Sequence, residues 1–184
     1  MVEKRPPTPP EASEFHLEKI VNGDFKGKSI LSLKQLDSAS LLKLSNVTLK
    51  ISQIDSGPLW SSLPSALLRD DVVGILCKNL SFNLPRISFE KAVTRLGGAV
   101  ILASADDTSI PPRESAEEAI MGLQINCDLV VLTDPQEKLF KMAKTSPRPI
   151  ISALLSYDPK FSKLAIDPKH TNMALLTLAL GKEI

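Results

Sequence analysis

The sequence has 184 residues, of which 43% are hydrophobic and 23% are charged, as in an ordinary globular domain. Its 22 basic and 21 acidic residues leave a formal charge of +1, too little to attract nucleic acid or anionic lipid over a distance. No apolar run approaches the roughly 20 residues that span a bilayer, and the N-terminus lacks an apolar signal core. We therefore expect a cytoplasmic domain that binds neither nucleic acid nor membrane.

Residues 1–14 are predicted to be a disordered tail. They contain Pro6, Pro7, Pro9 and Pro10 among charged and small residues, a composition that buries too little apolar surface to fold. The globular domain is expected to span residues 15–184.

A helix is predicted after Asp37, which can cap its N-terminus. Apolar residues recur at helical spacing after this cap, and Gly57 with Pro58 would end the helix. These apolar positions are Leu41, Leu44, Val47, Ile51 and Ile54. We expect this face of the helix to lie against a core.

Four short apolar runs follow, and each is predicted to be a strand. Near-continuous apolar runs are typical of strands that are buried on both faces of a parallel sheet. The runs cover residues 72–77, 99–103, 128–132 and 149–153. Because segments with helical periodicity separate them, the sequence predicts an α/β domain with a parallel four-stranded sheet flanked by helices.

The connecting helices are predicted from the periodicity between these runs. They cover residues 88–96, about 114–125, 136–144 and, at the end of the chain, 172–180. Gly97 and Gly98 are expected to close the first of them.

Neither a cofactor nor a metal site is expected. Cys77 and Cys127 each border an apolar run, which favours buried thiols in a reducing compartment. The acidic residues between positions 106 and 118 have no histidine or cysteine beside them, so we expect a solvated face rather than a metal site.

Several segments resemble one enzyme family. Residues 26–33 (KGKSILSL), residues 86–90 (RISFE) followed by residues 95–98 (RLGG), and residues 128–132 (DLVVL) are similar to the carbamoyl-phosphate domain of the aspartate and ornithine carbamoyltransferases, the aspartate enzyme more closely. The likeness runs from about residue 25 to residue 180, where HTNMALL resembles the family's HPTQALL helix start. The family chain normally continues into a second domain that binds the amino acid, and this chain stops there. The resemblance implies a trimer formed through the present domain.

The resemblance also locates a phosphate cradle, an S-T-R-T-R turn at a helix N-terminus where backbone N–H groups, hydroxyls and a guanidinium converge. The register set by residues 88–90 (SFE) places Phe82 at a hydroxyl position, Leu84 at the phosphate-binding arginine and Arg86 at the final arginine, the one cation that is kept. Pro85 in this turn lacks a backbone N–H. The turn thus keeps the family's position at a helix N-terminus but lacks most of the groups that bind the anion.

Three other parts of the family's site differ as well. The lysine of its mobile loop corresponds to Pro112, with Arg113 as the nearest cation. The arginine of its R-H-P turn corresponds to Thr133. In the last helix His170 is retained, but the glutamine that holds the carbamoyl amide corresponds to Met173.

These replacements predict a degenerate carbamoyltransferase-like domain. Three lost cations, each worth about 1.5–3 kcal/mol in a charge-assisted hydrogen bond, remove on the order of 5 kcal/mol of anion binding. That is about three decades in affinity. We therefore predict no productive binding of carbamoyl phosphate and no useful carbamoyl transfer. The predicted role is that of a binding or assembly module, whose partners are further copies of itself or an intact carbamoyltransferase.

Alternatives remain open from the sequence. Residual carbamoyl-phosphate binding would use His170, Arg86 and Arg113. A new reaction would instead take an apolar ligand in a cleft lined by Phe82, Leu84 and Met173, unless Phe82 and Leu84 fill the space of the phosphate. A truncated product without a selected activity is a third possibility.

Non-functional interpretations also compete at single positions. Arg86 can pair with Glu90 one helical turn later. His170 is expected to be a surface or locally hydrogen-bonded residue. Without a second domain, apolar helix surface around Leu175, Leu178 and Leu180 is expected to need cover.

Overall fold

The sheet that the sequence predicts is present in the computed structural model, which describes residues 18–55, 67–78, 83–104, 116–134, 141–159 and 167–184. Its strands are β1 (Val72–Cys77), β2 (Ala99–Ser104), β3 (Leu129–Leu132) and β4 (Ile150–Ser152). All pairings are parallel, and the order across the sheet is β2-β1-β3-β4. The predicted fold class is confirmed.

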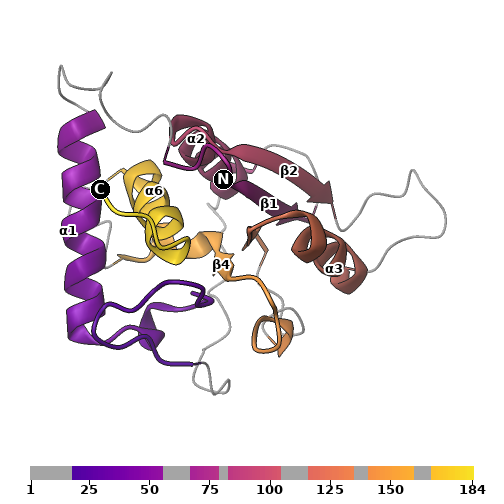
Figure 1. Ribbon diagram of the computed structural model, residues 1–184, viewed down its shortest axis with the longest axis horizontal. Helices are drawn as coiled ribbons and strands as arrows, with labels where there is room; N and C mark the ends of the chain where they lie inside the picture. Colours follow the sequence, from indigo (N-terminus) through magenta and orange to yellow (C-terminus); the bar gives the residue numbers. More distant parts are fainter. Residues whose placement is uncertain (1–17, 56–66, 79–82, 105–115, 135–140, 160–166) are drawn as a thin grey trace, which may run out of the picture.

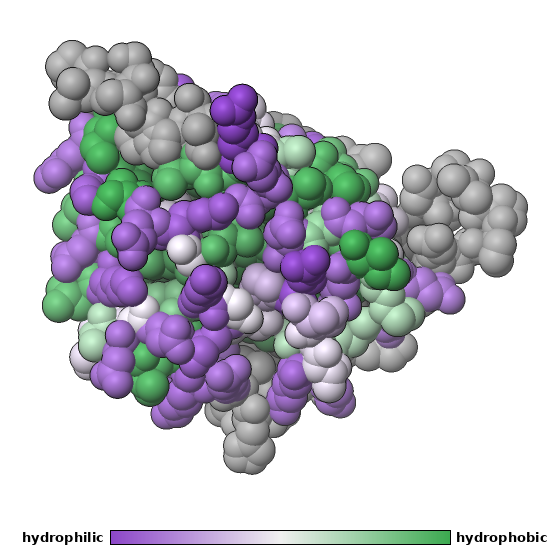
Figure 2. Space-filling model, in the orientation of Figure 1, coloured by the Kyte–Doolittle hydropathy of each residue, from purple (hydrophilic) through white to green (hydrophobic). Residues whose placement is uncertain are grey.

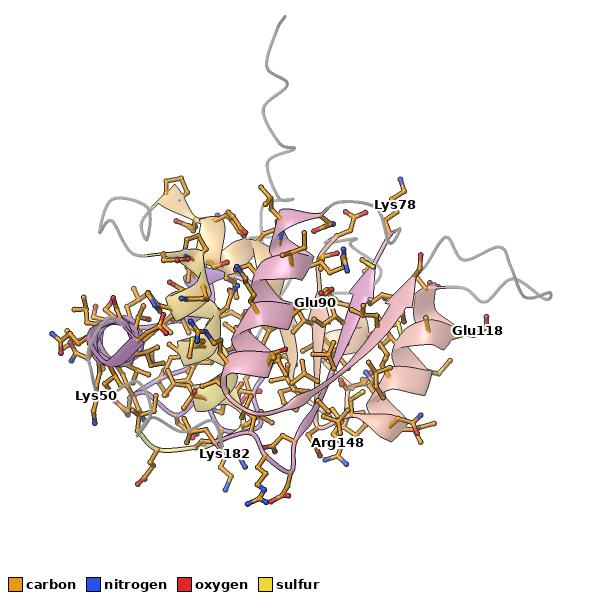
Figure 3. All side chains as sticks on the ribbon, turned by 90° about the horizontal axis from the view of Figure 1, so that it is seen from above. Lys50, Lys78, Glu90, Glu118, Arg148 and Lys182 are labelled. Atoms are coloured by element: carbon orange, nitrogen blue, oxygen red, sulfur yellow. The ribbon has the colours of Figure 1, made fainter. Side chains whose placement is uncertain are left out.

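Helices cover both faces of this sheet (Figure 1 and Figure 3). On one face lie α1 (Ser38–Asp55), α2 (Leu84–Arg95) and α6 (Pro168–Ala179), and on the other lies α3 (Ala116–Asn126). Two short 3-10 helices, η2 (Leu33–Gln35) and η4 (Ala153–Tyr157), are described as well. Each face has its own core, with Ile75 and Phe89 in one, and Leu76 and Ile120 in the other.

The strands differ in burial according to their place in the sheet. The residues of β3 and β4 are all buried, and so are those of β1 after Val72. The expectation that all four runs are buried on both faces is wrong for β2, where Ile101 and Leu102 are 40% and 41% exposed. The reason is position, because β2 is the outer strand next to β1 and, among the described strands, pairs on one side only.

The first helix begins as predicted. Asp37 Oδ1 accepts the backbone N–H of Ser40 at 2.8 Å, a standard N-cap. The buried positions Ser40, Leu44, Thr48 and Ile51 follow at helical spacing, so α1 turns one face to the core.

Two helices begin four residues earlier than predicted, because the residue before each supplies a cap. Asn83 accepts the N–H of Arg86 at 3.0 Å before α2, and Asp167 accepts the N–H of Lys169 at 2.8 Å before α6. Prolines stand at the start of both helices, where their missing N–H costs nothing. Of the predicted 136–144 helix, residues 141–143 are helical and residues 136–140 lie outside the described part of the chain.

The last helix is sandwiched between its neighbours. Every residue of α6 from His170 to Ala179 is buried, since α1 packs on one side and α2 on another (Figure 3). Leu175 is fully buried, Leu178 is 7% exposed and Leu180 packs partly buried against the same core. The expectation of uncovered apolar surface around these three leucines is therefore wrong, and it gives no argument for a partner.

Candidate functional site

The candidate site lies at the carboxyl ends of β1 and β3, where parallel α/β sheets commonly bind ligands. Thr133 comes directly after β3 and is 5% exposed. Its N–H and its hydroxyl both donate to the carbonyl oxygen of Leu76 on β1, at 3.0 and 3.3 Å. The Thr133 hydroxyl is thus committed to holding the two strand ends together.

Arg86 is engaged within its own helix. Its Nη1 lies 2.5 Å from Oε1 of Glu90, one turn further along α2, so the predicted ion pair is confirmed. Its charge also reaches the end of β1: burial raises the pKa of the Cys77 thiol, Arg86 partly offsets this, and Glu90 adds to the rise. The Arg86 cation is therefore neutralised by a carboxylate at the place where the resemblance puts an anion ligand.

The remaining cradle positions give no ligand group within the described chain. Leu84, the first residue of α2, is 57% exposed. This exposure gives no support to the possibility, left open by the sequence, that the Leu84 side chain fills the space of the phosphate. Phe82 and Arg113 lie outside the described residues.

His170 has a buried partner from far away in the chain. Its Nε2 lies 2.7 Å from Oδ2 of Asp55, at the end of α1, and the two side chains are 9% and 6% exposed. A carboxylate only accepts, so the imidazole Nε2 carries the proton and donates it. The expectation of a surface or locally bonded histidine is wrong, because tertiary packing brings together residues 115 positions apart.

Asp55 collects further positive charge. Lys169 forms an ion pair with its Oδ2, and Nη2 of Arg95 lies 3.6 Å from its Oδ1. Burial opposes ionisation of Asp55, but the hydrogen bonds and charges of Lys169 and His170 outweigh it, so the pKa of Asp55 lies below its ordinary value. This carboxylate links the end of α1 to the start of α6 and the end of α2.

The Asp55 cluster includes a residue at the far end of α2 from Arg86. Arg95 is the last residue of α2, whereas Arg86 lies in its first turn. Nine residues at 1.5 Å per residue place the two about 14 Å apart along the helix. The structure thus brings Arg86 and Thr133 to one edge of the sheet, while His170 bonds to a carboxylate that also meets the far end of α2.

Met173 belongs to the core, with 1% of its surface exposed. Beside it, Nδ2 of Asn172 donates to the hydroxyl of Ser88 at 2.8 Å and joins α6 to α2.

Two cavities have linings that the structure describes, of about 420 Å³ and 300 Å³, and none of the seven predicted site residues lines either. Sequence reasoning missed Asp55 and Asn172, since both pair across long separations.

The two cysteines are buried and free, as predicted. Burial raises the pKa of both thiols. We expect the native protein at pH 7.5 to react with an aromatic disulfide reagent at least about tenfold more slowly than the urea-unfolded chain, because the thiolate is the reactive form. Absorbance of the released thiol measures both rates. Equal rates in the two states would contradict this expectation.

These features define a class, an α/β domain with a ligand edge at the carboxyl ends of a parallel sheet. Residues 28–159 match the aspartate/ornithine carbamoyltransferase, carbamoyl-P binding domain family. The chain belongs to this family.

Relatives include aspartate carbamoyltransferases. The chain is 30% identical over 151 residues to the multifunctional protein pyrABCN of Emericella nidulans, covering 78% of this chain and 6% of that protein. It is 28% identical over 135 residues to the aspartate carbamoyltransferase catalytic subunit of Thermococcus kodakarensis, covering 71% of this chain and 41% of the subunit.

Solved structures agree with this. Aspartate transcarbamoylase from Trypanosoma cruzi, in complex with carbamoyl aspartate and phosphate, superposes with a TM-score of 0.59 at 27% identity, over 72% of this chain and 42% of that one. The M. jannaschii catalytic subunit gives 0.58 at 28% identity, over 68% and 40%. The chain therefore spans about two-fifths of these catalytic chains.

The match with the family ends at residue 159, before α6. The correspondence of His170 and Met173 to the family's ligand residues therefore depends on the HTNMALL motif alone. No helix in the part of the chain that the structure describes is long and apolar enough to cross a membrane.

Proposed function

We propose that this chain is a carbamoyltransferase-family domain that does not bind carbamoyl phosphate productively and acts in assembly. The observation that carries the proposal is the buried pair of His170 and Asp55 at 2.7 Å. His170 is the ligand contact that the motif retains, and its Nε2 is already bonded.

The other polar groups support the same conclusion. Arg86 is paired with Glu90, and the Thr133 hydroxyl is bonded to the Leu76 carbonyl oxygen. Drawing Arg86 or the Nε2 atom of His170 to a ligand would break a charge-assisted hydrogen bond worth about 1.5–3 kcal/mol. This cost adds to the loss of the cations replaced by Leu84, Pro112 and Thr133, so the affinity for carbamoyl phosphate should be lower still.

Assembly is the role that fits such a domain. Two of the similar proteins are named catalytic subunits, a word that places them within larger assemblies. We infer self-association of this chain, as the trimer that the resemblance implies, or mixed assembly with an intact carbamoyltransferase. The free buried cysteines fit a reducing cytoplasm as the place where this occurs.

A reaction on an apolar ligand has less support. Such a cleft would need Leu84 and Met173 on one open surface, but Met173 is 1% exposed while Leu84 is 57% exposed. We therefore keep the assembly role as the proposed function.

Isothermal titration calorimetry with carbamoyl phosphate tests the binding part of the proposal. We expect a dissociation constant weaker than about 1 mM, because about three decades of affinity are lost with the three cations. The Thermococcus kodakarensis catalytic subunit, titrated in the same buffer, is the positive control. Micromolar binding to this chain, displaced by a phosphonoacetyl analogue, would overturn the proposal.

A further inference from the structure

The larger of the two described cavities lies between the segment before α1, α1 itself and the end of the chain. Its volume of about 420 Å³ is typical of a small-molecule site. Figure 1 shows the C-terminal segment running beside α1 and α6, where these pieces meet. The cavity is lined by residues 23–26, Lys43, Val47, Thr177, Leu178 and residues 181–184.

Two lysine side chains lie against glycines in the wall of this cavity. The ammonium group of Lys43, on α1, donates to the carbonyl oxygen of Gly23 at 2.8 Å. The stem of Lys26 runs over Gly181, where a Cβ atom added to the glycine would lie 2.6 Å from Lys26 Cδ. A Cβ atom on Gly23 would lie equally close to Lys43 Cδ, and both glycines have a positive φ, +70° and +69°. Glycine thus leaves room for both lysine stems along the wall. We call this site the Lys26–Lys43 cavity.

Some charges of the cavity are already balanced. Asp24 is paired with Lys28 at 3.3 Å, and Lys182 is paired with Asp71 at 2.7 Å. These two pairs contribute no net charge to the cavity.

The remaining charges leave a positive excess. Lys26 and Lys43 have no carboxylate partner in the described ranges, and Glu183 has no cation there. At the rim, Lys50 donates to the carbonyl oxygen of Ile184, so the last residue has a cation of its own. Two lysines against one glutamate leave a net charge of +1.

Unused hydrogen-bond donors border the cavity as well. The backbone N–H groups of Phe25 and Lys26 donate no hydrogen bond to any residue that the structure describes. Phe25 is 1% exposed, and a buried N–H group without a partner is uncommon in folded proteins. Because both residues line the cavity, an acceptor bound there is the natural partner for these groups.

The cavity also has an apolar wall. Val47 of α1 and Leu178 of α6 line it together with Phe25. Figure 2 shows hydrophobic and hydrophilic side chains interspersed over α1 and its surroundings. A ligand that fills this space therefore needs a hydrocarbon part beside its charged group.

We propose that the Lys26–Lys43 cavity binds a small organic monocarboxylate. Its carboxylate accepts charge-assisted hydrogen bonds from the two lysines, and its hydrocarbon part packs on Val47 and Leu178. The excess of one positive charge matches one carboxylate. A phosphate dianion fits less well, because Glu183 repels its second charge.

Titration of the isotope-labelled full chain with hexanoate, followed by its amide NMR signals, tests the proposal. We expect saturable binding with a dissociation constant of about 1 mM, as suits a ligand of few atoms. The shifted signals should come from residues that line the cavity. Hexanol, which has the same chain without the charge, and inorganic phosphate should each bind at least about tenfold more weakly.

Two lysine variants locate the carboxylate. Lys26→Ala and Lys43→Ala should each weaken hexanoate binding at least about tenfold, because each removes one charge-assisted hydrogen bond. Both lysines are exposed, so the variants should keep the wild-type circular dichroism spectrum. The matched control is Lys91→Ala, an exposed lysine of α2 outside the cavity, which should bind hexanoate as wild type does.

Several results would overturn the proposal. These are no binding at about 20 mM hexanoate, signal shifts away from the cavity, and wild-type affinity in either variant of a cavity lysine. Equal affinity for hexanol would remove the role of the lysines, and tighter binding of phosphate would contradict a monocarboxylate ligand. Since no residue that the resemblance assigns to carbamoyl phosphate lines the cavity, these results are independent of the calorimetric test above.

Discussion

Replacing Asp55 with alanine is expected to lower the free energy of unfolding by about 3 kcal/mol, because removing one partner of a buried ion pair leaves the others uncompensated. The Asp55 side chain is 6% exposed and receives His170 at 2.7 Å and Lys169. The loss should lie at the lower end of the range for buried pairs, since Lys169 and Arg95 are 20% and 44% exposed and can turn to water. Urea unfolding followed by circular dichroism measures the change.

The matched control for this variant is Asp70→Ala. Asp70 is exposed, and its carboxylate makes no ion pair within the part of the chain that the structure describes. We expect a change within about 0.5 kcal/mol for this substitution. If Asp55→Ala were as stable as Asp70→Ala, the Asp55 cluster would not hold α1 against α6 and α2.

The same carboxylate predicts a dependence on pH. The pKa of Asp55 is lower in the folded protein than its ordinary value, so its charge contributes stability above the unfolded pKa of about 3.9. That contribution is lost as the pH falls through the lower folded pKa. Wild type should therefore lose stability more steeply than Asp55→Ala below about pH 4. Parallel curves for the two proteins in this range would argue against a depressed pKa.

Replacing Phe89 with alanine should cost still more, about 4 kcal/mol, since truncating a buried phenylalanine removes apolar burial and leaves a cavity. Phe89 lies in α2, is fully buried and belongs to the core that α1, α2 and α6 share with the sheet. Urea unfolding again gives the value, and the slope with denaturant should stay unchanged if both proteins unfold in two states.

Leu84→Ala is the control on the same helix. Its side chain is 57% exposed, so its truncation should change stability by less than about 0.5 kcal/mol. A cost close to that of Phe89→Ala would mean that Leu84 is packed in a buried space, such as the space that a phosphate would otherwise occupy. Equal, small losses at both positions would instead contradict the core assignment of Phe89.

Local patterns predicted much of this fold because they act over short separations. The run VVGILC became β1 with the predicted ends, and the Asp37 cap began α1. The ion pair of Arg86 and Glu90 was predicted from their spacing alone. Apolar periodicity does not predict the early starts of α2 and α6, because the caps Asn83 and Asp167 begin each helix before its first periodic apolar residue.

By itself the sequence determined the strands, most helix positions and the family. That Leu84, Pro112 and Thr133 replace cationic ligands stays a prediction from the resemblance. Only the tertiary structure decided that Asp55 bonds His170, that α1 covers α6 and that β2 comes first in the strand order, next to β1. Apolar runs such as VVGILC and AVILAS carry the same hydrophobic signal, but the number of neighbours each strand receives depends on the order of the sheet. Likewise, a buried carboxylate and an imidazole 115 residues away pair only when two helices pack together, which no local pattern specifies.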